Sequence, residues 1–199
     1  MATITINGIS FDPIKQSIEL AAAGLYAANA SESNYILIQT KAPLTKDQKA
    51  ELAAKHVAVL EYVPDQTYMC KYQPSDLEAI RSLPFVEWAN TYMKGFKIGP
   101  SLESGSDPDS RSLLSFSLIP EKSSGSESKI VDLVFHQDVD PKTMGHQVAL
   151  AAGMDPMNLH YGTHKIRLEV ETGERLANLA AIDEVRHIEP VVAKKLHHL

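Results

Sequence analysis

Few residues of this chain have the type and spacing that chemistry requires. His160 and His164 stand four residues apart, so that on one helix face their imidazoles could bind zinc. Gly162 lies between them and favours a turn over a helix, and the pair has no third ligand. We therefore expect no metal site and no cofactor.

Cys70 is the only cysteine, and it lies in an apolar, strand-like stretch with no histidine beside it. A thiol in such surroundings is buried and inert, because nothing stabilises the reactive thiolate. A single cysteine also cannot form an internal disulfide, so the fold must hold without covalent cross-links.

The composition is that of a globular protein of one or two domains, with 44% hydrophobic and 22% charged residues in 199. The net charge of -6, with scattered Lys and Arg, argues against nucleic acid or a membrane surface as partner. No stretch approaches the roughly 18 apolar residues of a spanning helix. The N-terminus lacks the basic start of a signal peptide, so we expect an intracellular, cytoplasmic protein.

Two segments stand outside any repeat. Residues 99–129 hold eleven serines, which is typical of a flexible linker, although residues 113–119 alternate like a strand that could dock on a sheet edge. Residues 1–33 predict a short strand over 3–6 that ends at Asn7 and Gly8. They also predict a helix over 13–28 with one apolar face and Asp12 as N-cap.

An internal repeat flanks the linker. In the first copy, residues 34–98, the expected strands cover 35–39, 58–62, 67–72 and 85–89. Its two helices are expected to start at capping boxes, Thr45 with Gln48 and Ser75 with Glu78.

The second copy, residues 130–199, has expected strands over 130–135, 165–170 and 185–189. One helix should run from an Asp140 cap to Ala152 with Gly153 as stop signal, and another over 176–182. Four apolar residues of each copy correspond at a constant offset of 99: Leu77, Ile80, Leu83 and Val86 match Leu176, Leu179, Ile182 and Val185.

The order of elements predicts the fold class. We expect an α+β protein of two ferredoxin-like βαββαβ sandwiches in tandem, with antiparallel sheets and an extra N-terminal strand and helix. Both helices of each copy cover one sheet face, which leaves the other face as a candidate binding surface.

The first copy resembles a known family. Its motifs PLT at a helix start, VLEYVPD, LPFVEWA and a tail reading FKI-P-L are similar to the propeptide region of long-type subtilisin-like serine proteases. The second half resembles the partner repeat of that region in LANLAAIDEVRHIEP and the tail KKL.

The resemblance implies a stand-alone protease inhibitor or folding chaperone whose partner is a subtilisin-like serine protease. The open sheet face would pack on two protease helices, and Glu61 and Asp65 beside a hairpin turn could cap the N-termini of partner helices. The C-terminal tail would lie in the substrate cleft, with Leu199 in the first pocket, Leu196 in the fourth, and His197 and His198 between them.

The protease itself is missing from the chain, because it contains neither an Asp-Thr-Gly segment nor a Gly-Thr-Ser-x-Ala segment. Residues 160–164 resemble the subtilase histidine motif, but a triad needs two further groups. We interpret these residues as a β-turn and expect no protease activity.

Two alternatives stay open. The two copies could enclose a cavity for a small molecule, as in some cyclases and isomerases, with Tyr62, Tyr92, His160 and His164 as candidate acids and bases. Residues 1–33 could also cover the sheet face that an inhibitor needs. The sequence leaves the oligomeric state undetermined.

Overall fold

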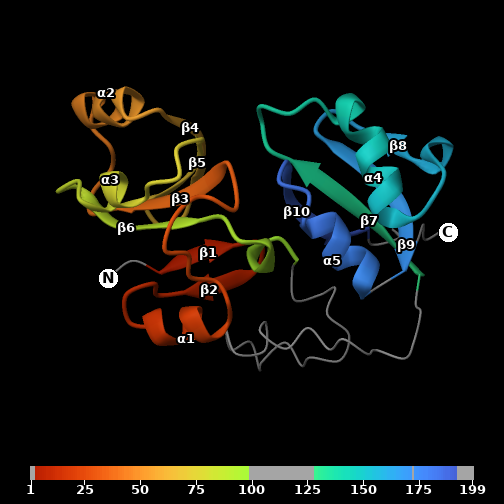
Figure 1. The fold of residues 1–199 in the computed structure, drawn as a ribbon, viewed down its shortest axis with the longest axis horizontal. Coiled ribbons are helices and arrows are strands. Elements are labelled where there is room, and N and C mark those ends of the chain that lie inside the picture. The colour runs from red at the N-terminus through yellow and green to blue at the C-terminus, as the bar shows by residue number, and fades with distance from the viewer. Residues whose placement is uncertain (1–2, 99–127, 172, 192–199) are drawn as a thin grey trace, which may run out of the picture.

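The computed structural model describes residues 3–98, 128–171 and 173–191 (Figure 1). Within these residues the chain is a mixed α+β protein with ten strands, five α-helices and three antiparallel sheets. One sheet has two strands and each of the others has four. The expected strand over 113–119 and the tail residues 196–199 lie outside the described residues.

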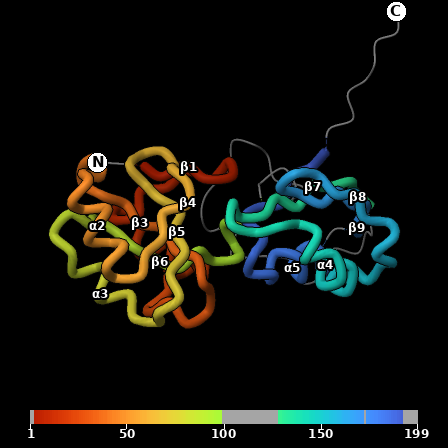
Figure 2. Tube along the Cα trace, turned by 90° about the horizontal axis from the view of Figure 1, so that it is seen from above, coloured from red at the N-terminus to blue at the C-terminus, as the bar shows by residue number. Residues whose placement is uncertain are grey.

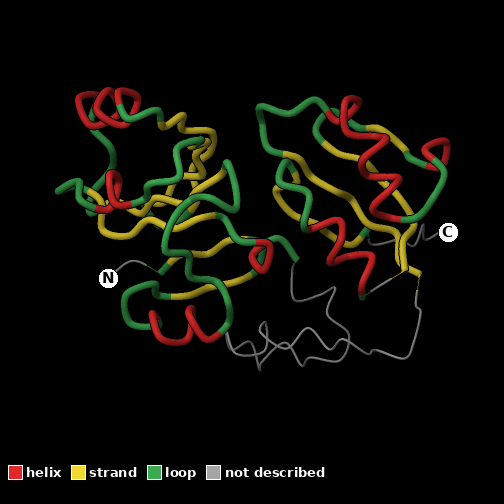
Figure 3. The backbone as a smooth tube through the Cα atoms, in the orientation of Figure 1, coloured by secondary structure: helices red, strands yellow, loops and turns green. Residues whose placement is uncertain are grey.

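The first four-stranded sheet has the order β4-β5-β3-β6. Ile36 and Ile38 on its inner strand β3 are fully buried in one core cluster with residues of the helices α2 and α3. Figure 3 shows these two helices on the same side of the strands. The elements of this unit are β3 (Tyr35–Thr40), α2 (Lys46–Ala54), β4 (Val57–Val63), β5 (Thr67–Tyr72), α3 (Glu78–Arg81) and β6 (Val86–Thr91).

The two helix starts of this unit differ in how well they were predicted. The capping box at α2 is confirmed: the Gln48 N–H donates to Thr45 Oγ1 at 3.2 Å and the Thr45 N–H to Gln48 Oε1 at 3.0 Å. The box expected at Ser75 is wrong. Asp76 instead accepts the Glu78 N–H at 3.0 Å, because an Asx turn can satisfy that donor two residues on.

An N-terminal extension, residues 3–33, precedes this unit. Its strands β1 (Ile4–Ile6) and β2 (Ile9–Phe11) form a hairpin whose turn residues Asn7 and Gly8 have φ values of 52° and 81°. Positive φ at both positions is what a two-residue turn of type I′ requires. The strand over 3–6 and its stop are confirmed, whereas β2 was not predicted.

The helix expected over 13–28 is wrong in length and face. The observed α1 covers only Ser17–Ala22, and Ile18 on it is 84% exposed. Asp12 accepts the N–H groups of Ile14 and Lys15 in a turn before the helix, so it is not the N-cap. Gly24, with φ of 69°, adopts the left-handed conformation that ends helices.

The extension covers the face of the first sheet that α2 and α3 leave free (Figures 1 and 2). Buried Ile4, Ile6 and Phe11 lie in one core cluster with Leu37 and Met69 of the sheet. The Phe11 ring lies edge-on to Trp88, with centroids 5.9 Å apart, and stacks on Phe96 at 5.5 Å. The first sheet is therefore covered on both faces.

The second four-stranded sheet repeats the strand order of the first. When the strands are numbered along the chain within each unit, both sheets have the order fourth strand, first strand, third strand, second strand. The elements of the second unit are β7 (Ser128–Phe135), η4 (Pro141–Met144), α4 (Gly145–Ala152), η5 (Pro156–Asn158), β8 (His160–Tyr161), β9 (Lys165–Glu171), α5 (Glu174–Ala180) and β10 (Val185–Pro190).

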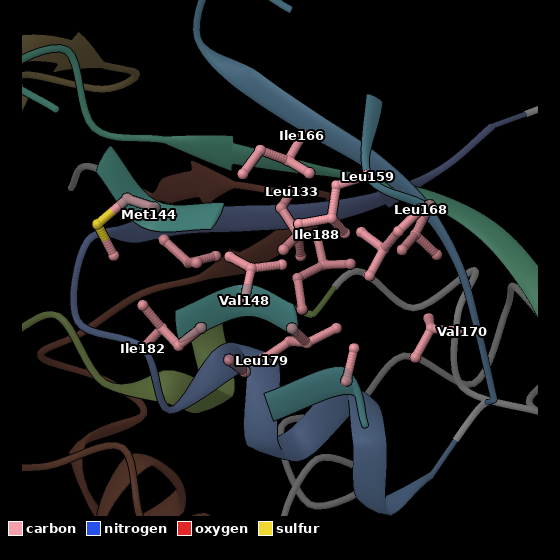
Figure 4. Close-up of a cluster of buried hydrophobic side chains, with 14 of the residues drawn as sticks. Leu133, Met144, Val148, Leu159, Ile166, Leu168, Val170, Leu179, Ile182 and Ile188 are labelled. Carbon is pink, nitrogen blue, oxygen red and sulfur yellow. The ribbon is translucent and has the colours of Figure 1, made fainter. Parts of the chain in front are cut away.

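The core of the second unit lies between its sheet and the helices α4 and α5 (Figure 4). The eight residues that correspond at the offset of 99 are all buried. Asp140 caps η4 by accepting the Lys142 N–H at 3.0 Å, and Gly153, with φ of 66°, ends α4 as expected. The β-turn interpretation of residues 160–164 is wrong for the first two residues: His160 and Tyr161 form β8, and the turn begins at Gly162, whose N–H donates to the Lys165 carbonyl at 2.8 Å.

The cover over the first sheet is testable at Phe11. Truncating Phe11→Ala leaves a cavity between Trp88 and Phe96, and should lower the free energy of unfolding by about 3–5 kcal/mol. Ile18→Ala, at an exposed position of the same extension, should change it by less than about 0.5 kcal/mol. Urea unfolding followed by fluorescence of the only tryptophan measures both. Equal effects would mean that the extension does not pack on the sheet.

Candidate functional site

The first unit ends against the second sheet. After η1 (Lys94–Phe96), Ile98 forms a parallel bridge with Ile188 of β10. The Ile188 N–H donates to the Lys97 carbonyl at 2.8 Å, and the Tyr92 hydroxyl donates to the Arg186 carbonyl. The outer edge of β10 is therefore covered by residues of the first unit.

Side chains reinforce this junction. Arg186 binds Glu61 through two parallel hydrogen bonds, Nε to Oε2 at 2.6 Å and Nη2 to Oε1 at 2.8 Å. Asn7, from the turn of the extension, donates to the Tyr92 hydroxyl at 2.8 Å and accepts from Arg186 at 3.3 Å. The extension, the first unit and the second unit thus meet in one hydrogen-bonded cluster.

A second group of contacts joins the units around His136. Its ring stacks on Tyr35, with centroids 3.6 Å apart and planes 9° apart. The Tyr35 hydroxyl donates to Asp138 at 3.1 Å, and the Lys71 ammonium donates to the same carboxylate at 2.8 Å. Burial opposes ionisation of Asp138, but the hydrogen bonds from Lys71 and Tyr35 hold its pKa below the usual value.

Burial shifts the titration of the junction residues. It lowers the pKa of His136 to about 3, aided by the nearby Lys97 charge, and His136 Nε2 has no partner among the described residues. It lowers the pKa of Lys97 to about 8, while Lys97 Nζ donates to the Ile182 carbonyl at 2.9 Å. It raises the pKa of the Tyr35 and Tyr92 hydroxyls. Because His136, Lys97 and Tyr92 are enclosed between the two units, the junction fixes the units relative to each other.

The four residues expected to line an inter-unit cavity do not come together. Tyr92 is buried in the junction, whereas Tyr62 is exposed on β4, edge-on to Tyr68. His160 and His164 are exposed at the β8–β9 hairpin of the second unit. His160 lines a groove there that contains none of the other three.

The residues expected to contact a protease lie in different surroundings. The Glu61 carboxylate is occupied by Arg186. Asp65 is exposed in the β4–β5 turn, and its N–H donates to the Thr3 carbonyl at 3.3 Å. Leu196, His197, His198 and Leu199 lie outside the described residues.

The second sheet has a face that no element of the described chain covers. Ile130 on β7 is 48% exposed on this face, and the side chain of Glu189 on β10 is 49% exposed. Asp132 lies between them, buried beneath Arg167 and Lys165, which bind it at 2.9 and 3.1 Å. The hydrogen bond from Arg167 is the main reason that the pKa of Asp132 is lowered. The result is a mixed, locally neutralised surface with one exposed aliphatic side chain.

Sequence reasoning missed most of the residues that build the junction. Arg186 and Glu61 are 125 positions apart, and nothing local to His136 marks it. Asp132 did carry a signal, because it interrupts an apolar strand and stands opposite Arg167 in the alternating strand β9.

Two classes of site are absent from the described ranges. No three His, Cys, Asp or Glu side chains there are grouped so that they could hold a metal ion. None of the helices in those ranges has the length and apolarity needed to cross a bilayer.

A family model described as a domain of unknown function, DUF8729, matches residues 5–93. This stretch starts within β1 and ends after β6, so it includes both the covering hairpin and the sheet beneath it. No curated protein and no solved structure matches the chain.

The buried His136 makes stability depend on pH. Below about pH 6.5 the unfolded chain binds a proton at this histidine, whereas the folded chain does so only near its pKa of about 3. The unfolded state therefore binds more protons in this window, and the free energy of unfolding falls as the pH falls. Between about pH 6.5 and pH 4 the intact chain should lose about 3 kcal/mol more than His136→Phe, which keeps a stacking ring. Urea unfolding measures the free energy of unfolding of both proteins at each pH. If it fell equally for the intact chain and for His136→Phe, His136 would not be buried at the junction.

The Glu61–Arg186 pair should couple the two units energetically. A double-mutant cycle of Glu61→Ala and Arg186→Ala should give an interaction of about 0.5–3 kcal/mol, because both side chains are largely shielded from water. A cycle pairing Arg186→Ala with Glu87→Ala, an exposed glutamate without contact to Arg186, should give none. Equal coupling in both cycles would contradict the junction.

Proposed function

We propose that the chain is a binding protein of the subtilase-propeptide type that inhibits a subtilisin-like serine protease or assists its folding in trans. The sequence resemblance over both repeats supports this proposal. The shared strand order of the two four-stranded sheets, with both helices of each unit on one face, supports two ferredoxin-like sandwiches in tandem.

The observation that carries the proposal is the unequal covering of the two sheets. The extension occupies the free face of the first sheet, whereas the corresponding face of the second is uncovered in the described residues. Residues 192–199 follow β10 of that second sheet after the single residue Val191. In a propeptide-type mechanism the sheet face and the following tail act together, so we assign the protease-binding role to the second unit.

The character of the exposed face fits a reversible partner. Asp132 and Arg167 already satisfy one another, so this pair stays neutralised when a protein docks there, whereas Glu169 opposite Ile130 would need a basic residue of the partner. Ile130 offers an apolar contact among otherwise polar surroundings, and a transient interface combines such apolar contacts with a polar rim. The tail would add backbone hydrogen bonds in the cleft, as extended peptides do on proteases.

The first unit has a different role in this proposal. Its sheet is covered on both faces, and Lys97 and Ile98 at its C-terminal end cover the edge of β10. It would act as a rigid support that fixes the second unit and leaves the protease-facing surface free.

Titration of the full chain into a panel of subtilisin-like proteases, followed by peptide hydrolysis, tests the proposal. We expect inhibition that is lost in a chain ending at Ala193. Ile130→Asp should weaken inhibition about tenfold or more, because it places a charge in an apolar contact. Leu150→Asp is the matched control, since Leu150 is 76% exposed on α4, which packs on the opposite side of the same sheet.

Two results would contradict the proposal. Absence of inhibition at every concentration and with every protease would remove protease binding as the function. Inhibition that Leu150→Asp abolishes and Ile130→Asp leaves intact would move the contact to the helical side of the second unit.

A further inference from the structure

The strand β9 of the second unit is longer than the strand that protects its outer edge. All seven residues of β9 pair with β7, from Lys165 opposite Val134 to Glu171 opposite Ser128. On the other side β8 pairs only with Ile166 and Arg167. Residues 168–171 therefore form an open sheet edge in the described structure.

The start of β8 only at His160 has a local cause. Asp155 caps the short helix η5 by accepting the Met157 N–H at 2.9 Å, and Pro156 has no N–H to offer to a ladder. The chain around η5 is therefore coiled and does not extend along residues 168–171 of β9. It reaches the edge of β9 only at His160.

Two hydrogen bonds of β9 determine which backbone groups face this edge. The His164 carbonyl accepts from Phe135 at 2.9 Å, on the β7 side, whereas the Lys165 carbonyl accepts from Gly162 at 2.8 Å, on the β8 side. Backbone groups alternate between the two sides of a strand. The N–H and C=O groups of Glu169 and Glu171 consequently point to the open edge, where no described residue pairs with them.

A groove of about 700 Å³ runs along the same edge. One wall is residues 168–171 of β9, and the facing wall includes Met154 and Met157, with His160 at the end where β8 begins. Met157 is 88% exposed. Unpaired donors and acceptors at a strand repeat, beside a wall that carries two methionines together with Asn158 and Arg175, match an extended peptide better than a compact ligand.

The side chains specify the charge of that peptide. Glu169 and Glu171 are exposed on the outer face of the sheet, whereas Val170 between them is buried on the helix side. The nearest cation on the outer face, Arg167, is held by Asp132. Residues that stand opposite each other in a ladder share a face, so basic residues would pair with the two glutamates and an apolar residue with Val170.

A second copy of the chain fits this edge poorly. Antiparallel pairing of two β9 edges about Val170 would set Glu169 of one copy opposite Glu171 of the other, and like charges directly opposite destabilise a ladder. Shifting the pairing to bring Arg167 opposite Glu169 is blocked, because His160 already pairs with Arg167.

We propose that the open edge of β9, residues 168–171, binds an extended segment of a partner protein in which basic residues alternate with apolar ones. This site adjoins the sheet face assigned to protease binding, since Ile130 lines the same groove and stands opposite Glu169, but the peptide proposal does not depend on that assignment. The partner strand would continue the sheet beyond β8, with its apolar side chains in the groove beside Met154 and Met157.

Fluorescence anisotropy of labelled peptides with the full chain tests the site. A Val-Lys-Val-Lys-Val-Lys peptide should bind about tenfold more tightly than its Val-Glu counterpart, and Glu169→Lys with Glu171→Lys should invert this preference. Glu189→Lys is the control, because it changes an exposed glutamate on β10, whose edge is covered. Methylation of alternate peptide nitrogens should abolish binding, since it removes the ladder hydrogen bonds.

Several results would overturn the proposal. Failure of both peptides to bind would mean that the two glutamates only protect the edge from aggregation. If the peptides bound much more tightly after residues 113–119 were replaced by Gly-Ser, the natural occupant of the edge would be residues 113–119 of the chain itself. Self-association that Glu169→Lys changes would assign it to a second copy. Inhibition of a protease is not measured in any of these assays, so failure here leaves the protease proposal standing.

Discussion

The contact between the end of the first unit and the edge of β10 determines which surfaces of this protein remain available. The Ile188 N–H to Lys97 carbonyl bond and the Ile98–Ile188 bridge place residues of one unit along the sheet of the other. Enclosing the Lys97 ammonium there is costly, as its lowered pKa indicates, and the Ile182 carbonyl is its compensating partner. Arg186, bound to Glu61, then fixes the orientation through two parallel hydrogen bonds.

The N-terminal extension has the complementary effect on the first unit. Its hairpin buries Phe11 and its neighbours on the sheet face that the repeat alone would leave open, and Asn7 carries that hairpin into the junction. One repeat is thereby closed and the other left with an exposed face and a partly open edge. Two units of the same strand order consequently have different roles: the first supports, and the second presents the surfaces that we propose for binding.

Local signals in the sequence were sufficient for much of this fold. The Thr45 capping box, the Asn7-Gly8 turn and the Gly153 stop each act within a few residues, and each was found where expected. The offset of 99 identified equivalent buried positions because a repeated core keeps its apolar spacing. The failures have physical reasons too: Asp76 competed with Ser75 for one N–H, and α1 is shorter than its apolar pattern because Ile18 faces solvent. The junction could not be predicted, since it depends on residues such as His136 and Tyr35 that meet only in the folded chain.

We propose that the second sheet, and not the first, faces the protease. Hydroxyl-radical footprinting of the full chain, free and bound to a catalytically inactivated subtilisin-like protease, tests it by comparing the reactivity of exposed side chains. We expect Ile130 to become protected in the complex while Ile18 on the extension and Leu150 on α4 keep their reactivity. Protection of Ile18 with Ile130 unchanged would contradict it, because the protease would then be bound at the unit whose sheet is already covered.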